Sequence, residues 1–298
     1  MEFRVYLGPF ETATDHIYSQ LVRNQNVLEA EGIYVVPRGR CNIIWQLLLD
    51  YEETQKPRTE FLQDFISCCL EECETPDIQQ IVIFQPGVSD GILGTLRGAD
   101  ILPRVRFITR IYLKCIPPDN LMMTAAVRAP SSYIPALYAR RLKRGDLLRF
   151  EEFLFDIKPE EMIWSDTWSR LILPFTNLHP DDAPLYVWRH EDYPDNWREV
   201  LSTITGHQNP DMFSKSEDTI ETDISLYGAA LYAHYIETQQ IENIHERREA
   251  FKLFASDYPD DGTIIKDDYW TPKLIETLND AYADDWYFLE QMDHVVTI

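Results

Sequence analysis

The first residues with the means to do chemistry lie in the turn after the opening apolar run. Residues 3–8 are typical of a short strand, and a helical pattern begins near Asp15. Thr12 and Thr14 place hydroxyl groups just before that helix. A strand, a turn that opens at a glycine and a helix form the layout of a loop that holds a phosphate group with backbone N–H groups. The sequence therefore predicts an anion-binding loop with Gly8, Thr12 and Thr14 as binding residues.

The same turn carries a residue that opposes anion binding. A loop of this layout usually carries a lysine, and an acid, Glu11, stands near that position. Losing one aimed charged group typically costs roughly 3–4 kcal/mol. Two like charges about 4 Å apart repel by about 4 kcal/mol at an effective dielectric constant near 20, whereas the helix dipole offsets only about 1–2 kcal/mol. We therefore expect repulsion to prevail.

Three arginines are candidates to replace the missing lysine. Arg38 and Arg40 directly follow a second predicted strand, and Arg128 follows a later one. Ligands of open parallel sheets bind at the carboxyl ends of the strands, so each of these cations is a candidate binding residue, although solvated loop arginines are common. A metal ion bridging Glu11 and Asp15 through oxygen ligands is the weaker alternative, and we assign no metal site.

Further polar residues near strand ends are candidates for acid–base chemistry or binding. His16 lies beside the loop and has the pKa range of a general base, and Asp90 follows a third strand, where it could deprotonate an acceptor hydroxyl. Each also has a structural interpretation, as a helix-surface histidine and as a loop acid. Ser132 follows Arg128 as a candidate for binding, and Ser131 or Ser132 can cap the next helix. Residues 190–192 are polar but lack metal-ligand spacing.

The elements that must position these residues follow from apolar runs and helical periodicity. The runs predict strands at residues 3–8, 32–36, 80–84, 120–127 and 185–188. A helix over residues 15–30 makes the start a βαβ unit with a parallel crossover. Residues 105–113 alternate basic and apolar side chains and fit a helix or an edge strand. The basic residues 140–144 fall in the last turn of a predicted helix, where the helix dipole favours cations.

Domain organisation and compartment follow from length and composition. The 298 residues suffice for an α/β domain over residues 1–210, with an acidic helical extension over residues 211–298 packed on it. The helices of the extension are expected near residues 226–237, 243–256 and 272–291. No apolar run approaches the roughly 20 residues that span a bilayer. The odd cysteine count predicts no disulfide framework, and we expect a cytoplasmic protein.

The charge of the chain limits its partners. With a net charge of −23, most of the surface repels nucleic acid and anionic lipid. The 45% hydrophobic content argues against disorder. The C-terminal helices combine acids with aromatic residues that would suit a protein partner, or would form core instead. These aromatic residues are Trp270, Tyr282, Trp286, Tyr287 and Phe288.

The loop, Arg128 and the helix after it resemble the sulfotransferase-like branch of the P-loop fold. Active members hold the phosphosulfate of PAPS (3′-phosphoadenosine 5′-phosphosulfate) in the loop after the first strand, and an arginine and a later serine hold its 3′-phosphate. Thr12 and Thr14 match the loop hydroxyls and Arg128 matches the arginine. The C-terminal motifs look similar to alphaproteobacterial proteins of this branch and carry no known chemistry. The resemblance covers most of the chain and implies a P-loop, sulfotransferase-like α/β fold.

Departures from that pattern shape the functional expectation. Glu11 replaces the lysine, Ala13 replaces a glycine, and Ala136 replaces the serine. PAPS and its product PAP are therefore disfavoured, and the cofactor is left unassigned. The leading hypothesis is a non-catalytic binding protein, or one that acts on another ligand. The alternatives are an active sulfotransferase or related phosphate-donor transferase with substitute arginines, and a structural assembly subunit.

Overall fold

The centre of the protein is a parallel β-sheet. The computed structural model describes residues 1–54, 56–86, 96–97, 100–101, 105–162, 168–169, 184–213, 224–260 and 269–298. Within them the sheet has the strand order β2-β3-β1-β6-β7-β8, and each neighbouring pair is parallel. The strands are β1 (Glu2–Tyr6), β2 (Ile33–Val35), β3 (Gln80–Phe84), β6 (Leu121–Val127), β7 (Leu185–Arg189) and β8 (Val295–Thr297). The predicted α/β class, a parallel sheet flanked by helices, is confirmed.

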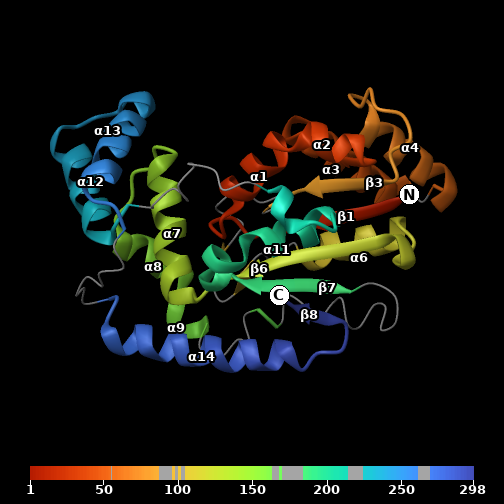
Figure 1. The fold of residues 1–298 in the computed structure, drawn as a ribbon. Coiled ribbons are helices and arrows are strands. Elements are labelled where there is room, and N and C mark those ends of the chain that lie inside the picture. Colours follow the sequence, from red (N-terminus) through yellow and green to blue (C-terminus); the bar gives the residue numbers. More distant parts are fainter. Residues whose placement is uncertain are drawn as a thin grey trace.

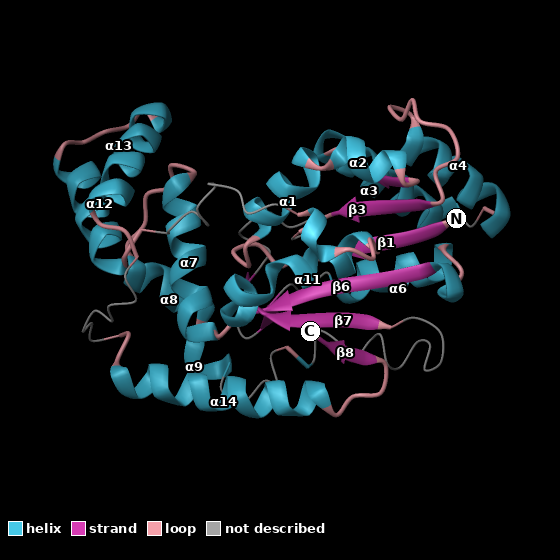
Figure 2. Cartoon of the chain, viewed as in Figure 1, coloured by secondary structure: helices cyan, strands magenta, loops and turns pink. Residues whose placement is uncertain are grey.

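Helices cover both faces of the sheet (Figures 1 and 2). Tyr6 of β1 packs with one face, whereas Phe3 and Val5 pack with the other, because successive side chains of a strand point to opposite sides. The Tyr6 face is covered by α1 (Thr14–Arg23), α2 (Gln25–Ala30) and α11 (Tyr193–Thr205). The opposite face is covered by α3 (Arg38–Thr54), α4 (Arg58–Leu70) and α6 (Val105–Cys115).

A second group of helices lies beyond the carboxyl ends of the strands. Figure 1 shows the arrowheads of β3, β6 and β7 pointing toward the side of α7 (Pro130–Lys143) and α8 (Phe150–Ile157). Three later helices, α12 (Leu226–Thr238), α13 (Ile244–Asp257) and α14 (Pro272–Glu290), pack against α7. Short elements complete the description, namely α9 (Pro159–Met162), the hairpin of β4 (Leu96–Arg97) and β5 (Asp100–Ile101), and the 3₁₀ turns η1 (Pro118–Asn120), η2 (His190–Asp192) and η3 (Pro210–Met212).

Helix α13 is joined to α7 by arginines. Arg247 Nη1 donates to the carbonyl of Gly145 at 3.2 Å, and Arg248 Nε donates to the carbonyl of Arg144 at 3.1 Å. Arg144 and Gly145 come directly after the last residue of α7, so these contacts hold the chain at the end of that helix. The C-terminal region thereby supports the helix that faces the carboxyl edge of the sheet.

Several sequence predictions need correction. The expected single helix over residues 15–30 is interrupted at Asn24, which separates α1 from α2. The C-terminal region is not wholly helical, because β8 joins β7 as a sixth strand. Neither Ser131 nor Ser132 caps α7, because Ala129 occupies the N-cap position. The Ser131 hydroxyl donates to the Asn279 side chain, and the Ser132 hydroxyl donates to the Ala129 carbonyl. Residues 105–113, left open between helix and strand, form most of α6. The helical pattern of residues 166–173 also predicts a helix, and this stretch lies almost wholly outside the described residues.

No helix in the described part of the chain is both long and apolar enough to cross a bilayer.

Candidate functional site

The loop between β1 and α1 is held against β6. Leu7 N–H donates to the Thr124 carbonyl, and Ala126 N–H donates to the Gly8 carbonyl, both at 2.9 Å. The backbone then turns sharply, with a cis Gly8–Pro9 peptide and positive φ angles of 92° at Gly8, 61° at Glu11 and 61° at Ala13. The predicted strand, turn and helix therefore occur in the predicted order. The turn lies at the carboxyl end of a central strand, the edge at which α/β proteins bind ligands.

The predicted loop hydroxyls face inward. Thr12 is fully buried, and its hydroxyl donates to the Pro9 carbonyl at 2.8 Å and lies 3.1 Å from the Tyr6 hydroxyl. Tyr6 is itself stacked between the rings of Phe84 and Trp188. Thr14 is also buried. The hydroxyl that the sequence offers to a ligand at Thr12 is thus used to close the loop on itself.

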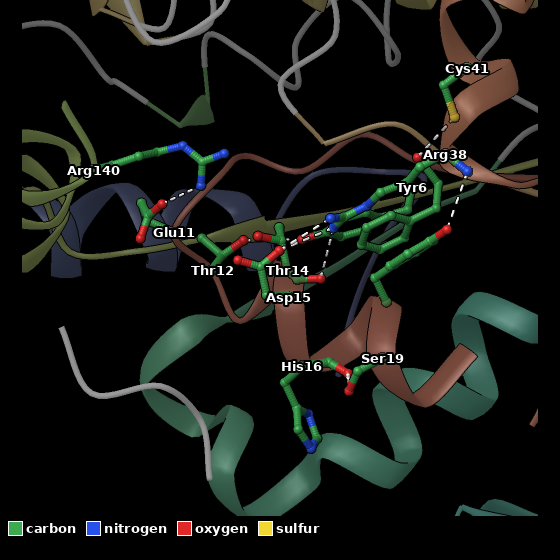
Figure 3. Close-up of polar contacts among 12 residues, drawn as sticks. Tyr6, Glu11, Thr12, Thr14, Asp15, His16, Ser19, Arg38, Cys41 and Arg140 are labelled. Atoms are coloured by element: carbon green, nitrogen blue, oxygen red, sulfur yellow. Dashed lines mark hydrogen bonds and ion pairs between the residues drawn. The ribbon is translucent and has the colours of Figure 1, made fainter. Parts of the chain in front are cut away.

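Glu11 pairs with Arg140, which the sequence analysis explained only as a cation in the last turn of a helix. Arg140 Nη1 lies 2.5 Å from Glu11 Oε1, and the two side chains are only 18% and 13% exposed. The Arg140 guanidinium also stacks over the ring of Phe10, 3.9 Å from its centre. Figure 3 shows the pair on one side of the loop. Arg140 is therefore more than a cation at the end of a helix, because it joins α7 to the loop.

Arg128 also reaches the loop, as predicted, and is 8% exposed. Its Nη1 donates to the main-chain carbonyl of Glu11 at 2.5 Å, and its Nε donates to the Ser132 hydroxyl at 3.1 Å. The carbonyl of Arg128 accepts a hydrogen bond from Trp168 Nε1 at 3.0 Å. The structure therefore brings Arg128 and Ser132 together with the loop, and the guanidinium binds the backbone of Glu11.

The two arginines after β2 point to different parts of the protein. Arg38 lies 3.3 Å from Asp15 and stacks over Tyr18, on the side of the loop away from Arg140 (Figure 3). Arg40 is directed to the end of α4 instead, where its Nε donates to the Cys68 carbonyl at 3.1 Å. It also forms ion pairs with the carboxylates of Glu71 and Glu72. Arg40 is thus not brought to the candidate site, because it lies in the first turn of α3 and points toward α4.

The predicted acid–base residues do not meet at the loop. His16 Nδ1 lies 2.7 Å from the Tyr193 hydroxyl, and its ring contacts Trp197 edge-on. Figure 3 shows this ring pointing away from Glu11 and Thr12. Asp90 lies outside the described residues. His16 is therefore placed as a packing residue between α1 and α11, and its position does not support the role of a base at the loop.

Two buried polar residues beside the loop were not among the predicted site residues. Tyr133 is fully buried, and its hydroxyl has no hydrogen-bond partner among the described residues. Burial raises the pKa of Tyr133, and the Glu11 carboxylate raises it further, while Arg128 and Arg140 oppose the shift. The spacing of 133 and 140, close to two helical turns, was the available signal that the two residues share a face.

The second is His190, which follows β7. Its Nδ1 is buried and has no hydrogen-bond partner in the described part of the protein. Burial lowers the pKa of His190 to about 3, and the positive charge of Arg128 adds to the shift. His190 is thus a neutral imidazole beside Arg128. The neighbouring acid Glu191 has a structural role, since Oε1 accepts the N–H of Ala129 at 2.9 Å and Oε2 accepts the Tyr282 hydroxyl at 3.0 Å.

The two acidic side chains of the loop are each paired with an arginine. Glu11 faces Arg140, and Asp15 faces Arg38. Among the described residues, no group of three or more histidine, cysteine, aspartate or glutamate side chains is arranged to hold a metal ion. Comparisons of the chain with protein-family models, with curated proteins and with solved structures find no match.

Proposed function

We propose that the chain is a sulfotransferase-like protein whose donor loop no longer takes PAPS. It is then a non-catalytic binding protein, or one that acts on a different ligand. The observation that carries this proposal is the ion pair between Glu11 and Arg140, 2.5 Å long and largely shielded from water. The Glu11 carboxylate already pairs with Arg140, a cation that a phosphosulfate group in the loop would need.

Charge balance supports the proposal. A phosphosulfate entering the loop would face the Glu11 carboxylate at close range, and two unit charges about 4 Å apart repel by about 4 kcal/mol at an effective dielectric constant near 20. Moving the carboxylate away would separate it from Arg140, and breaking a partly buried pair costs a few kcal/mol. Either route weakens binding. A nucleotide with millimolar affinity has only about 4 kcal/mol of binding free energy, so a penalty of this size is decisive.

The other polar groups of the loop also argue against nucleotide binding. The Thr12 hydroxyl is fully buried and is bonded to Pro9 and Tyr6. Arg128 spends one guanidinium nitrogen on the Glu11 carbonyl and another on Ser132. The 3′-phosphate subsite that the resemblance implies has lost its serine, since Ala136 is buried at that position. Several contacts for the nucleotide are therefore absent or already made within the chain.

Nucleotide binding tests the proposal directly. PAP is titrated into the wild type, Glu11→Lys and the control Glu53→Lys, which makes the same charge change at an exposed position of α3. A ligand that binds the folded state stabilises it by RT ln(1 + [L]/Kd), or about 2.7 kcal/mol at one hundred times Kd. We expect no thermal shift for wild type or Glu53→Lys at millimolar PAP, and a shift for Glu11→Lys. Tight binding by wild type that Glu11→Lys weakens would refute the proposal.

An active transferase with substitute arginines is a second candidate. It is favoured by the three guanidinium groups around the loop, from Arg38, Arg128 and Arg140. If it is correct, wild type should transfer sulfate from PAPS to a phenolic acceptor, and Arg128→Gln should abolish transfer while the protein stays folded. The absence of PAP release over hours with concentrated protein would exclude it for that donor.

An assembly role is a third candidate, and the aromatic residues of α14 favour it. Tyr287 and Phe288 are 66% and 52% exposed on α14, among acidic side chains. Of the other expected anchors, Trp270 and Tyr282 belong to the core, and Trp286 packs beneath Arg189. A protein partner should therefore contact Tyr287 and Phe288. Light scattering that shows an oligomer disrupted by Tyr287→Ala with Phe288→Ala would support self-assembly, and a monomer at every concentration would exclude it.

We also propose a cytoplasmic location and no role in nucleic-acid binding. All five cysteines are free thiols, as is usual in a reducing compartment. The net charge of −23 disfavours contact with nucleic acid. Fractionation of the native host, with the protein in the soluble cytosolic fraction, is the check on location.

A further inference from the structure

Two buried hydrogen-bond donors beside the Glu11 carboxylate lack an acceptor. Arg140 donates to Glu11 through Nη1, while its Nε is buried and makes no hydrogen bond among the described residues. The Tyr133 hydroxyl is fully buried and likewise unpaired there. Buried polar atoms in native proteins nearly always have a partner. Two unpaired donors near one ion pair indicate an acceptor that the chain itself does not supply.

The two donors share one face of α7. Tyr133 and Arg140 are seven residues apart, so their side chains project from nearly the same side of the helix, two turns apart. Ala136 lies between them on that side and is buried. Its methyl group offers no polar atom to either neighbour. This face of α7 therefore carries a hydroxyl, a small apolar side chain and a guanidinium, and the guanidinium contacts Glu11 of the loop. The charges of Glu11, Arg128 and Arg140 all act on the Tyr133 hydroxyl and shift its pKa.

The Glu11 carboxylate uses only part of the hydrogen-bonding capacity of this face. One of its oxygens meets one nitrogen of Arg140, whereas Arg128 binds the main-chain carbonyl of Glu11 and not its carboxylate. A tetrahedral oxyanion has enough oxygens to accept from Arg140, Arg128 and Tyr133 together. Such an ion would also carry the charge that two guanidinium groups match, and phosphate pairs with arginine through several N–H groups.

The position of Glu11 allows an exchange. Its side chain is 13% exposed, so it lies at the border between the loop and solvent. Among the described residues, its carboxylate pairs with Arg140. Rotation of one side chain about its own bonds would free the α7 face without moving β1 or α1.

We propose that Glu11 is a displaceable internal occupant of an oxyanion subsite formed by Arg140, Tyr133 and Arg128, which takes one phosphate group. This inference rests on the proposed function, because it assumes that the loop is not filled by a sulfated nucleotide. The phosphate group is either inorganic phosphate or the end of a small phosphate monoester. Glu11 competes with it, so affinity in the wild type is held low.

Removing the competitor provides the test. Inorganic phosphate is titrated calorimetrically into wild type, Glu11→Ala and the control Glu53→Ala, with sodium chloride at matched ionic strength. We expect Glu11→Ala to bind phosphate at least about tenfold more tightly than wild type, and Glu53→Ala to bind like wild type. Glycerol 3-phosphate is titrated in parallel: tighter binding than phosphate assigns a monoester, and equal or weaker binding assigns the free ion.

A second pair of variants examines the tyrosine. In the Glu11→Ala background, Tyr133→Phe should weaken phosphate binding by about fivefold or more, as expected for one lost hydrogen bond. Tyr138→Phe is the matched control, because Tyr138 is a buried tyrosine of the same helix whose hydroxyl donates to Leu148. Equal loss in both variants, or no loss in Tyr133→Phe, would overturn the subsite. If Glu11→Ala does not fold, Glu11→Gln takes its place with the same expected order.

Other results would also overturn the proposal. Acetate that binds Glu11→Ala more tightly than phosphate would show a carboxylate site in its place. No phosphate binding to a folded Glu11→Ala would show that the two donors serve no oxyanion. The proposed function fails by a different result, namely tight PAP binding to the wild type, so the two failures are distinguishable.

Discussion

Arg140 Nη1 and Glu11 Oε1 lie 2.5 Å apart although the residues are separated by 129 positions in the chain. The contact joins α7, which stands beyond the carboxyl ends of the strands, to the turn at the end of β1. The stability of the loop and the position of α7 are thereby coupled through this pair of side chains.

Neutralising either partner of this pair should destabilise the protein. Because both side chains are mostly buried, Arg140→Gln or Glu11→Gln should each lower the free energy of unfolding by about 2–4 kcal/mol. The double variant should lose less than the sum, with a coupling energy of about 1–3 kcal/mol. Urea unfolding of the four proteins measures it. Arg141→Gln is the control, because its partner Asp146 is more exposed; additive losses at Arg140 and Glu11 would contradict the coupling.

A buried carboxylate of α14 should contribute far more to the stability of the fold than its exposed neighbour. Asp285 is buried and accepts the backbone N–H of Trp168 at 2.7 Å, and Trp168 in turn donates to the Arg128 carbonyl. Asp285→Ala should cost about 2–3 kcal/mol, because buried N–H groups lose a charged acceptor. Asp284→Ala, one residue earlier and exposed, should cost less than about 0.5 kcal/mol. Thermal unfolding distinguishes the two, and equal losses would exclude the role given to Asp285.

A glycine at the end of α7 should not tolerate a side chain. Gly145 has a φ of +91°, and a Cβ there would lie 2.5 Å from Ile244 Cγ1 of α13. Gly145→Ala should therefore destabilise by about 1–3 kcal/mol and loosen α13 from α7. Gly39→Ala is the matched control, since α3 leaves open space at that Cβ and alanine favours helix by about 1 kcal/mol. Proteolysis and chemical unfolding report both effects, and a neutral Gly145→Ala would refute the close contact.

Stability should fall in acid in part because of His190. Its pKa is lowered to about 3 by burial and by Arg128, whereas the unfolded value is near 6.5. Between these values the unfolded chain binds a proton that the folded chain does not, so the free energy of unfolding decreases as pH falls. The slope from one such group is at most about 1.4 kcal/mol per pH unit. His190→Asn should flatten the profile between pH 6 and about 3.5, and the exposed control His245→Asn should not.

Much of the sheet follows from the sequence because its strands are continuous apolar runs. The runs that form β3 and β6 are buried on both faces, so neither needs context to be recognised. The last strand, β8, gave no such signal: it is three residues long and mostly exposed. Its strand character comes from pairing with β7 at the edge of the sheet. That pairing depends on where α14 delivers the chain, which local patterns do not encode.

The candidate site was predictable only in part. The loop, Arg128 and Ser132 follow from local order along the chain, since each stands next to a strand end. Arg140 does not, because its sequence context, the last turn of a helix, already explains a cation. Its role depends on how α7 crosses the strand ends. The prediction that Arg40 belongs to the site is wrong, and tertiary packing again decides it. Arg40 stands only two residues after Arg38, but it points to α4 and not to the loop.

The place of β8 has a consequence for how the chain folds on the ribosome. β7 ends at Arg189, and the strand that pairs with its outer side begins only at Val295. During synthesis that side of β7 stays open to other strands until α14 and β8 have emerged. The nascent chain should therefore need shielding by a chaperone late in translation, and shortened products ending before β8 should aggregate.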